Sequence, residues 1–233
     1  ATAHKIEAQN VFSDWREVVK RPRFADAVLI CTQDAMHEEP AIACAACGYH
    51  ILLEKPLAPT LEACQRIVEA VTKYEVALAV GHVLRYTKHV RVLKKLLQEK
   101  AIGELVDVQL FEPVGFWHQA HSFVRGNWRN EAETSPMLLA KSCHDIDLLR
   151  HLVDRPCQRV SSFGSLVHFR PENRPAGAAD RCLDCAVEAT CPYSAKRFYF
   201  ERLQKGELDW PLNVVTPTPT PETLTKALRE GPY

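Results

Sequence analysis

The sequence predicts an α/β fold in which a parallel sheet with helices is followed by a second domain of α+β type. In the first part of the chain, short continuous apolar runs alternate with segments whose apolar residues recur at helical spacing. From Glu104 onward, apolar residues alternate with polar ones instead, as in strands that expose one face. We therefore expect a domain boundary near residues 100–104, with one domain over residues 1–103 and another over residues 104–233.

The strands of the first domain are expected at residues 27–31, 51–53 and 76–80. Each is a run of consecutive apolar residues, AVLIC, ILL and VALAV respectively. Such runs are typical of strands that helices cover on both faces of a parallel sheet. We expect the carboxyl ends of the three strands to lie at one edge of that sheet.

The helices of the first domain show terminal signals as well as spacing. Residues 37–47 are rich in alanine, and Gly48 suits a helix end because glycine readily adopts the left-handed conformation found there. Thr60 is a suitable N-cap for the next helix, in which apolar residues recur up to Tyr74. A third helical pattern ends near Gly103.

The second domain is expected to mix strands and helix. Val106, Val108 and Leu110 alternate with polar neighbours, which predicts a strand with one exposed face. Residues 136–153 have a helical pattern, and residues 160–169 favour another strand.

Composition excludes some classes of function. The formal net charge is +0, whereas a protein that binds nucleic acid or an anionic membrane would carry an excess of basic residues. No apolar run approaches the ~18–20 residues of a membrane-spanning helix. The nine cysteines are an odd number scattered along the chain, which does not match a secreted disulfide framework. We expect a reducing compartment, the cytoplasm.

Ligands of open parallel sheets bind at the carboxyl ends of the strands, which directs attention to three loops. These loops are Thr32-Gln33-Asp34, Glu54-Lys55-Pro56 and the segment 81–85. Pro56 biases Lys55 toward an extended backbone, and a lysine held near a carboxylate could donate or relay a proton. The alternative is that Lys55 and Arg85 are ordinary solvated charges.

A second candidate cluster lies within residues 141–147. Leu138, Ile146 and Leu149 belong to an apolar arc of the helical wheel, and the polar residues fall on the other arc. A histidine flanked by lysine and aspartates can perform acid/base chemistry, because histidine titrates near neutral pH. The alternative is a solvated helix face with ion pairs along the helix. The polar arc consists of Lys141, His144, Asp145 and Asp147.

The third cluster is Cys182-x-x-Cys185 followed by Cys191. Thiolates at this spacing are typical of a structural zinc site. Such a site would need a fourth ligand, which could come from Cys143, Cys157, His168 or a residue outside the chain. The alternative is three free thiols in a compact loop.

Taken together, these elements resemble the glucose-fructose oxidoreductase/inositol dehydrogenase (Gfo/Idh/MocA) family of NAD(P)-dependent enzymes. The resemblance runs from about Trp15 to Tyr199. It rests on the strand at residues 27–31 with Thr32 and His37 after it, the Glu54-Lys55-Pro56 triplet, Gly81-His82 followed by Arg85-Tyr86, and His144-x-x-Asp147.

The resemblance implies a partial Rossmann-type domain followed by an α+β domain whose mainly antiparallel sheet often mediates homo-oligomerisation. It implies that Lys55 contacts nicotinamide and substrate and is the main catalytic candidate, with His144 facing the substrate. It also implies a dinucleotide site lined by Thr32, Gln33, His37, Glu54 and Lys55.

The chain departs from the family pattern in three respects. No glycine-rich phosphate-binding turn stands before residue 27, and the family usually continues past residue 233, so we expect a fragment. Many members carry an aspartate four residues before the histidine, where this chain has Ala140. Lys141 or Asp145 is the candidate substitute, and both are candidate substrate contacts together with Arg85.

We therefore expect an NAD- or NADP-dependent dehydrogenase that acts on a hydroxyl or carbonyl of a sugar- or polyol-like substrate. The alternative is a truncated family member without catalytic competence that acts as a binding or oligomerisation module.

Overall fold

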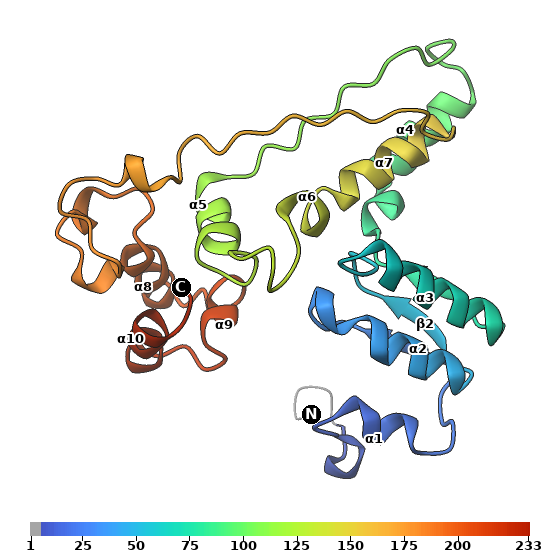
Figure 1. Ribbon diagram of the computed structural model, residues 1–233, viewed down its shortest axis with the longest axis horizontal. Coiled ribbons are helices and arrows are strands. Elements are labelled where there is room, and N and C mark those ends of the chain that lie inside the picture. The colour runs from blue at the N-terminus through green and yellow to red at the C-terminus, as the bar shows by residue number, and fades with distance from the viewer. Residues whose placement is uncertain (1–5) are drawn as a thin grey trace. The chain divides into compact units, whose positions relative to one another are not determined.

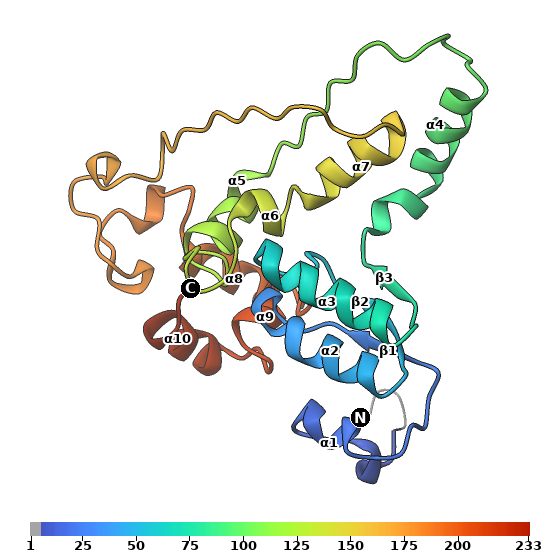
Figure 2. The same cartoon turned by 45° about the vertical axis from the view of Figure 1, so that its right-hand side comes forward.

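The computed structural model describes residues 6–233. The chain forms two compact units, each built from two stretches of sequence. Unit 1 comprises residues 1–110 and 134–156, and unit 2 comprises residues 111–133 and 157–233. Figures 1 and 2 show the elements of each unit. The boundary expected near residues 100–104 stays a prediction.

Unit 1 contains a three-stranded parallel sheet in the order β1-β2-β3, as expected from the three apolar runs. The strands are β1 (Ala27–Ile30), β2 (His50–Leu53) and β3 (Leu78–Val80). In the register, Leu29 of β1 lies opposite Leu52 of β2, and Leu52 lies opposite Ala79 of β3.

Helices α2 (Glu38–Ala46) and α3 (Leu61–Lys73) lie side by side and share the core of unit 1 with the sheet (Figures 1 and 2). Ile51 and Leu53 are buried in this core, whereas Leu52 between them is 43% exposed. Leu29, its neighbour in the register, is 69% exposed. The expectation that helices cover both faces of these strands is therefore wrong for this structure. Alternating side chains point to opposite faces, and α2 and α3 cover one of them.

The expected helix ends are confirmed. Gly48, two residues after α2, has a φ of +79°, a conformation that a side chain with a Cβ rarely adopts. Thr60 caps α3 because its side chain accepts a hydrogen bond from the backbone N–H of Ala63 at 3.2 Å.

Further elements complete unit 1. They are η2 (Ala8–Asn10), α1 (Trp15–Val19), η3 (Asp34–Met36), η4 (Val83–Tyr86), α4 (Lys88–Gln98), α6 (Met137–Ala140) and α7 (Cys143–Val153). The helix expected over residues 136–153 is thus divided into α6 and α7. Asp145 and Leu148 are the buried residues of α7, while Leu138 and Ile146 of the expected apolar arc are exposed.

Unit 2 is helical. Its helices are α5 (Phe116–Gln119), the π-helical turn η5 (Ala120–Val124), η6 (Pro171–Asn173), η7 (Cys182–Asp184), η8 (Glu188–Thr190), α8 (Ala195–Gln204), α9 (Leu212–Val215) and α10 (Pro221–Glu230). Tyr199, Leu212 and Leu224 are fully buried and form the centre of its core.

The strands expected at residues 106–110 and 160–169 are not formed. Within residues 6–233, the only sheet is the one in unit 1. A strand needs a neighbour to pair with its backbone N–H and C=O groups, and the described residues provide none for these two segments. Val106 and Phe163 are accordingly almost fully exposed.

Among the described residues, we find no helix that combines the length and the apolar character needed to cross a bilayer.

Candidate active site

The candidate site lies in unit 1, where the strand-end loops meet at the carboxyl edge of the sheet. His37, at the start of α2, connects two of these loops. Its Nδ1 lies 2.9 Å from the carbonyl oxygen of Pro56, and its Nε2 lies 3.0 Å from that of Thr32. The His37 side chain is fully buried. It therefore supports the backbone of the site, and its expected place in the lining of a dinucleotide site stays a prediction.

Lys55 lies in a closely packed turn after β2, next to a cis peptide bond to Pro56. The backbone N–H of Lys55 donates to Glu54 Oε2 at 3.1 Å. A Cβ at Gly81 would lie 3.2 Å from the same carboxylate oxygen, so a glycine there lets the end of β3 approach Glu54 closely. The Glu54 carboxylate thus accepts a hydrogen bond from the backbone N–H of Lys55.

The Lys55 side chain reaches the junction between α6 and α7. Its Nζ donates a hydrogen bond to the backbone carbonyl of Ala140 at 3.0 Å. An ammonium group has three donors, so this bond leaves two for other partners. Ala140 stands where the resemblance led us to expect an aspartate, and here its main chain is the acceptor.

His144, in the first turn of α7, packs edge-to-face against His82 with ring centroids 5.7 Å apart. The Nδ1 atom of each histidine is buried without a hydrogen-bond partner among the described residues. Burial lowers the pKa of His144, and the nearby cations Lys55 and Lys141 lower it further. His144 is therefore neutral at pH 7 and able to accept a proton.

Arg85 of η4 and Asp147 of α7 form a bidentate ion pair. Arg85 Nε lies 2.6 Å from Asp147 Oδ2, and Nη2 lies 2.5 Å from Oδ1. The hydrogen bond to Asp147 raises the pKa of Arg85. The alternative of a solvated helix face with ion pairs along the helix is therefore wrong for Asp147, whose partner lies on another element. Asp145 is also buried.

Three polar residues near the site had not been predicted as site residues. Asp34 is buried and accepts a hydrogen bond from the Ser135 hydroxyl. Cys143 is half-buried, and burial raises the pKa of its thiol. The position of Asp34 in the loop after the first strand could have marked it as a site residue. No comparable sequence feature links Ser135 or Cys143 to this site.

A cavity of about 510 Å³ adjoins the turn after β2 and the helices α6 and α7. His82, Cys143 and Asp147 are among the residues that line it. Its other walls are formed by Pro56, Leu57, Ala58, Cys64, Pro136, Leu138, Leu139, Ile146 and Arg150. Thr32 and Gln33 are exposed at the end of β1 and do not line this cavity.

The expected cysteine zinc site is not formed. Cys182, Cys185 and Cys191 are free thiols, and within residues 6–233 no three His, Cys, Asp or Glu side chains converge as metal ligands. Cys182 instead packs against the core of unit 2, where its Sγ accepts a hydrogen bond from the backbone N–H of Ala195 at 3.4 Å. Spacing in sequence did not bring the three sulfur atoms together.

Comparison with known families gives two matches along the chain. Residues 1–82 match the NAD-binding Rossmann-fold domain of an oxidoreductase family, and residues 94–202 match the C-terminal α/β domain of the same family. These matches confirm the predicted fold class as a Rossmann-type domain followed by an α/β domain, although the antiparallel sheet expected in the second is not formed within residues 6–233.

Curated relatives include dehydrogenases of sugars and polyols. Inositol 2-dehydrogenase of Serratia proteamaculans is 34% identical over 152 residues, which are 64% of this chain and 41% of that protein. Levoglucosan dehydrogenase of Pseudarthrobacter phenanthrenivorans is 31% identical over 65% of this chain and 38% of that protein. A 2,7-anhydro-N-acetylneuraminate hydratase of Escherichia coli is 28% identical over 64% and 39%. The chain thus spans about two fifths of the length of these relatives.

Solved structures agree. Levoglucosan dehydrogenase in complex with NADH and levoglucosan superposes with a TM-score of 0.52 at 32% identity, over 61% of this chain and 38% of that one. The WlbA dehydrogenase of Bordetella pertussis, in complex with NADH and UDP-GlcNAcA, gives a TM-score of 0.50 at 26% identity, over 61% and 40%.

Proposed function

The chain belongs to the glucose-fructose oxidoreductase/inositol dehydrogenase family, and from that premise we propose that it is an NAD(P)-dependent dehydrogenase of a sugar- or polyol-like substrate. The reaction would move a hydride between the nicotinamide and a carbon that bears a hydroxyl or carbonyl group. The observation that carries the proposal is the Lys55 ammonium, held by the Ala140 carbonyl beside the helix that bears His144.

Lys55 would assist proton transfer at the substrate oxygen. When the substrate alcohol is oxidised, its hydroxyl must lose a proton as its carbon loses a hydride. Two N–H donors of Lys55 remain after the bond to Ala140, enough to orient the substrate oxygen. His144 is its proposed partner, because a neutral imidazole can take up the released proton.

The nicotinamide supplies the hydride acceptor when it is bound. The residues proposed to face it are Thr32, Gln33, Glu54 and Lys55, which follow β1 and β2 at the carboxyl edge of the sheet. This edge is where dinucleotides bind in such sheets, so these residues fit the group. His37 would act on the dinucleotide only through the two carbonyls it contacts.

The proposal also covers the substrate contacts, the kind of substrate, the cell compartment and the oligomeric state. Lys141, three residues before His144, and Asp145, directly after it, are the proposed substrate contacts, while Arg85 is bound to Asp147. The names of the relatives, which include inositol and levoglucosan dehydrogenases, favour a polyhydroxylated substrate.

All nine cysteines are free thiols, which favours the reducing conditions of the cytoplasm. A homo-oligomer is part of the same proposal.

Turnover would test the function directly. NADH and NADPH absorbance would be followed with a panel of polyols and sugars, comparing Lys55→Ala with Lys73→Ala, a lysine in the last turn of α3. Loss of a positioned acid or base costs about 10²–10⁴-fold in rate, so we expect that loss for Lys55→Ala and none for Lys73→Ala. Full turnover by Lys55→Ala would refute the role of Lys55.

A second candidate is a binding or oligomerisation module without catalysis. The observation that favours it is the exposed apolar character of unpaired extended segments, seen at Val106, Val160 and Phe163. Titration of NAD(H) into the 233-residue chain separates the two candidates. Saturable binding supports the dehydrogenase, and absence of binding supports the module.

A further inference from the structure

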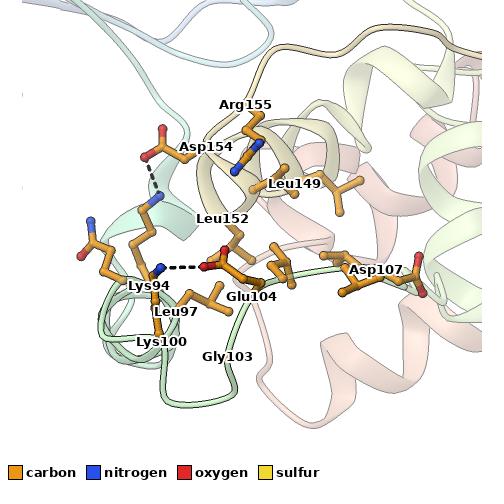
Figure 3. A pocket seen from close by; sticks show the side chains of 15 residues that line it. Lys94, Leu97, Lys100, Gly103, Glu104, Asp107, Leu149, Leu152, Asp154 and Arg155 are labelled. Carbon is orange, nitrogen blue, oxygen red and sulfur yellow. Dashed lines mark hydrogen bonds and ion pairs between the residues drawn. The ribbon is translucent and has the colours of Figure 1, made fainter.

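One side of α7 makes a row of contacts with η4 and α4. The contacting residues of α7 are His144, Asp147 and His151, spaced by three and four, which places them along one face of the helix, and Asp154 follows as its C-cap. Lys94 of α4 ends the row. Its Nζ donates to the backbone carbonyl of His151 at 2.6 Å. The same Nζ lies 3.2 Å from Asp154 Oδ2, as Figure 3 shows.

Two of these contacts, His82–His144 and Arg85–Asp147, lie nearest the candidate site, and their residues are three positions apart on both segments. His82 precedes η4 and Arg85 lies within it, three residues later. His144 begins α7 and Asp147 follows, again three residues later. The Arg85–Asp147 ion pair therefore lies one turn beyond the contact between the two imidazole rings.

The ion pair has the geometry of a structural clamp. Asp147 is 12% exposed and uses both carboxylate oxygens, each bonded to a different nitrogen of Arg85. Bidentate, charge-assisted pairs of this kind fix geometry as well as contributing energy. The nearby pair Arg150–Asp154 differs: its atoms are 3.9 Å apart and both side chains are largely exposed. Exposed pairs of that kind contribute little.

We propose that Arg85 and Asp147 form a positioning pair that holds α7 against η4 and thereby fixes His144 against His82, and that Arg85 does not contact substrate. Two of the donors of Arg85 are already engaged by Asp147, including its Nε. The ion pair does not itself touch the reacting atoms. The inference rests on the proposed function only in that His144 takes part in the reaction.

The pair controls the surroundings of His144. Lys55 faces it from the turn after β2, His82 from the loop before η4, and Lys141 and Asp145 from its own segment. Burial and the three basic groups disfavour the imidazolium, and Asp145 favours it. Without the clamp, water would reach the first turn of α7 and these constraints would relax. His144 would then bind protons more tightly.

The titration of His144 tests the proposal without requiring turnover. Ring signals of ¹³C-labelled histidine would be followed by NMR between pH 4 and 8, with the His144 signal assigned from its loss in His144→Gln. Arg85→Gln and Asp147→Asn should each raise the pKa of His144 by about one unit, a tenfold gain in proton affinity. The exchanged pair, Arg85→Asp with Asp147→Arg, should restore the original titration. Arg150→Gln, which breaks the exposed pair on the same helix, should leave it unchanged.

An unchanged His144 titration in folded Arg85→Gln and Asp147→Asn would overturn the proposal. If both fail to fold, Arg85→Lys decides the matter: it keeps the charge but loses the bidentate geometry, so an unaltered pKa again overturns the proposal. In turnover assays, Arg85→Lys should lower kcat with the substrate KM unchanged. A raised KM with unchanged kcat would identify Arg85 as a substrate contact. If the wild-type chain turns nothing over, the proposed function fails, while the NMR result still decides the role of the pair.

Discussion

Lowering the pH from 7 to 5 should destabilise unit 2 through a single buried histidine, His121. Its side chain is buried, and its Nδ1 lies 2.6 Å from the hydroxyl oxygen of Tyr199. Burial lowers the pKa of His121 to about 4, helped by the charge of Arg125 and by His118 and Arg202. Burial also raises the pKa of Tyr199, so its hydroxyl keeps its proton.

The sign and size follow from linkage. A depressed histidine pKa means that the unfolded chain binds the proton more readily, so stability falls as pH falls below the unfolded value of about 6.5. With a folded value of about 4, the contribution of His121 to the free energy of unfolding drops by about 2 kcal/mol between pH 7 and pH 5.

Urea denaturation of the wild type and of His121→Gln at several pH values would measure this effect. Glutamine cannot titrate but keeps a hydrogen-bonding group for Tyr199, so the variant should be less stable than the wild type at pH 7 and lose that disadvantage toward pH 5. The exposed His89 in α4 provides the control, because His89→Gln should follow the wild-type pH dependence. A stability difference between wild type and His121→Gln that stays constant from pH 7 to pH 5 would refute the reasoning.

Three substitutions test local features of the fold by urea denaturation. Thr60→Ala removes the N-cap of α3 and should cost about 1 kcal/mol of stability; no loss would show that the cap contributes nothing. Gly48→Ala places a Cβ at a φ of +79° and should cost about 1–2 kcal/mol, while Gly164→Ala, which meets no atom within 4 Å, should cost little. Equal effects at the two glycines would contradict the strain argument. Leu224→Ala in the core of unit 2 should cost about 2–5 kcal/mol, and Val214→Ala at an exposed site less than about 1.

The sheet and its flanking helices were predictable because their signals are local. Runs of apolar residues identify the strands, and a residue such as Gly48 or Thr60 marks a helix end through its own backbone or side chain. The position of Lys55 at the carboxyl edge of the sheet followed from the same local pattern. The contact of Lys55 could not be predicted, because its acceptor is the backbone carbonyl of Ala140. Every residue has such a carbonyl, so the sequence does not distinguish this one.

The failures have physical causes too. A helical wheel assigns charged residues to solvent, but Asp147 is satisfied by a cation 62 residues earlier in the chain and Asp145 is buried. The alternating pattern at residues 106–110 is suitable for a strand, but a strand forms only where a second strand pairs with its backbone. The spacing of Cys182, Cys185 and Cys191 is compatible with metal binding, but a metal site also requires the sulfur atoms to converge on one point. Among the described residues they do not form such a group.

The division of unit 1 into two stretches has a consequence for the chain during its synthesis. Lys55 leaves the ribosome 85 residues before Ala140, and Asp34 precedes Ser135 by 101 residues. At the usual elongation rates of about 5–20 residues per second, Lys55 waits roughly 4–17 s for its acceptor. Through that interval the nascent sheet, with α2 and α3 packed on it, carries an incomplete site. Lys55 therefore reaches its acceptor only after residues 111–133, the first stretch of unit 2, have been synthesised.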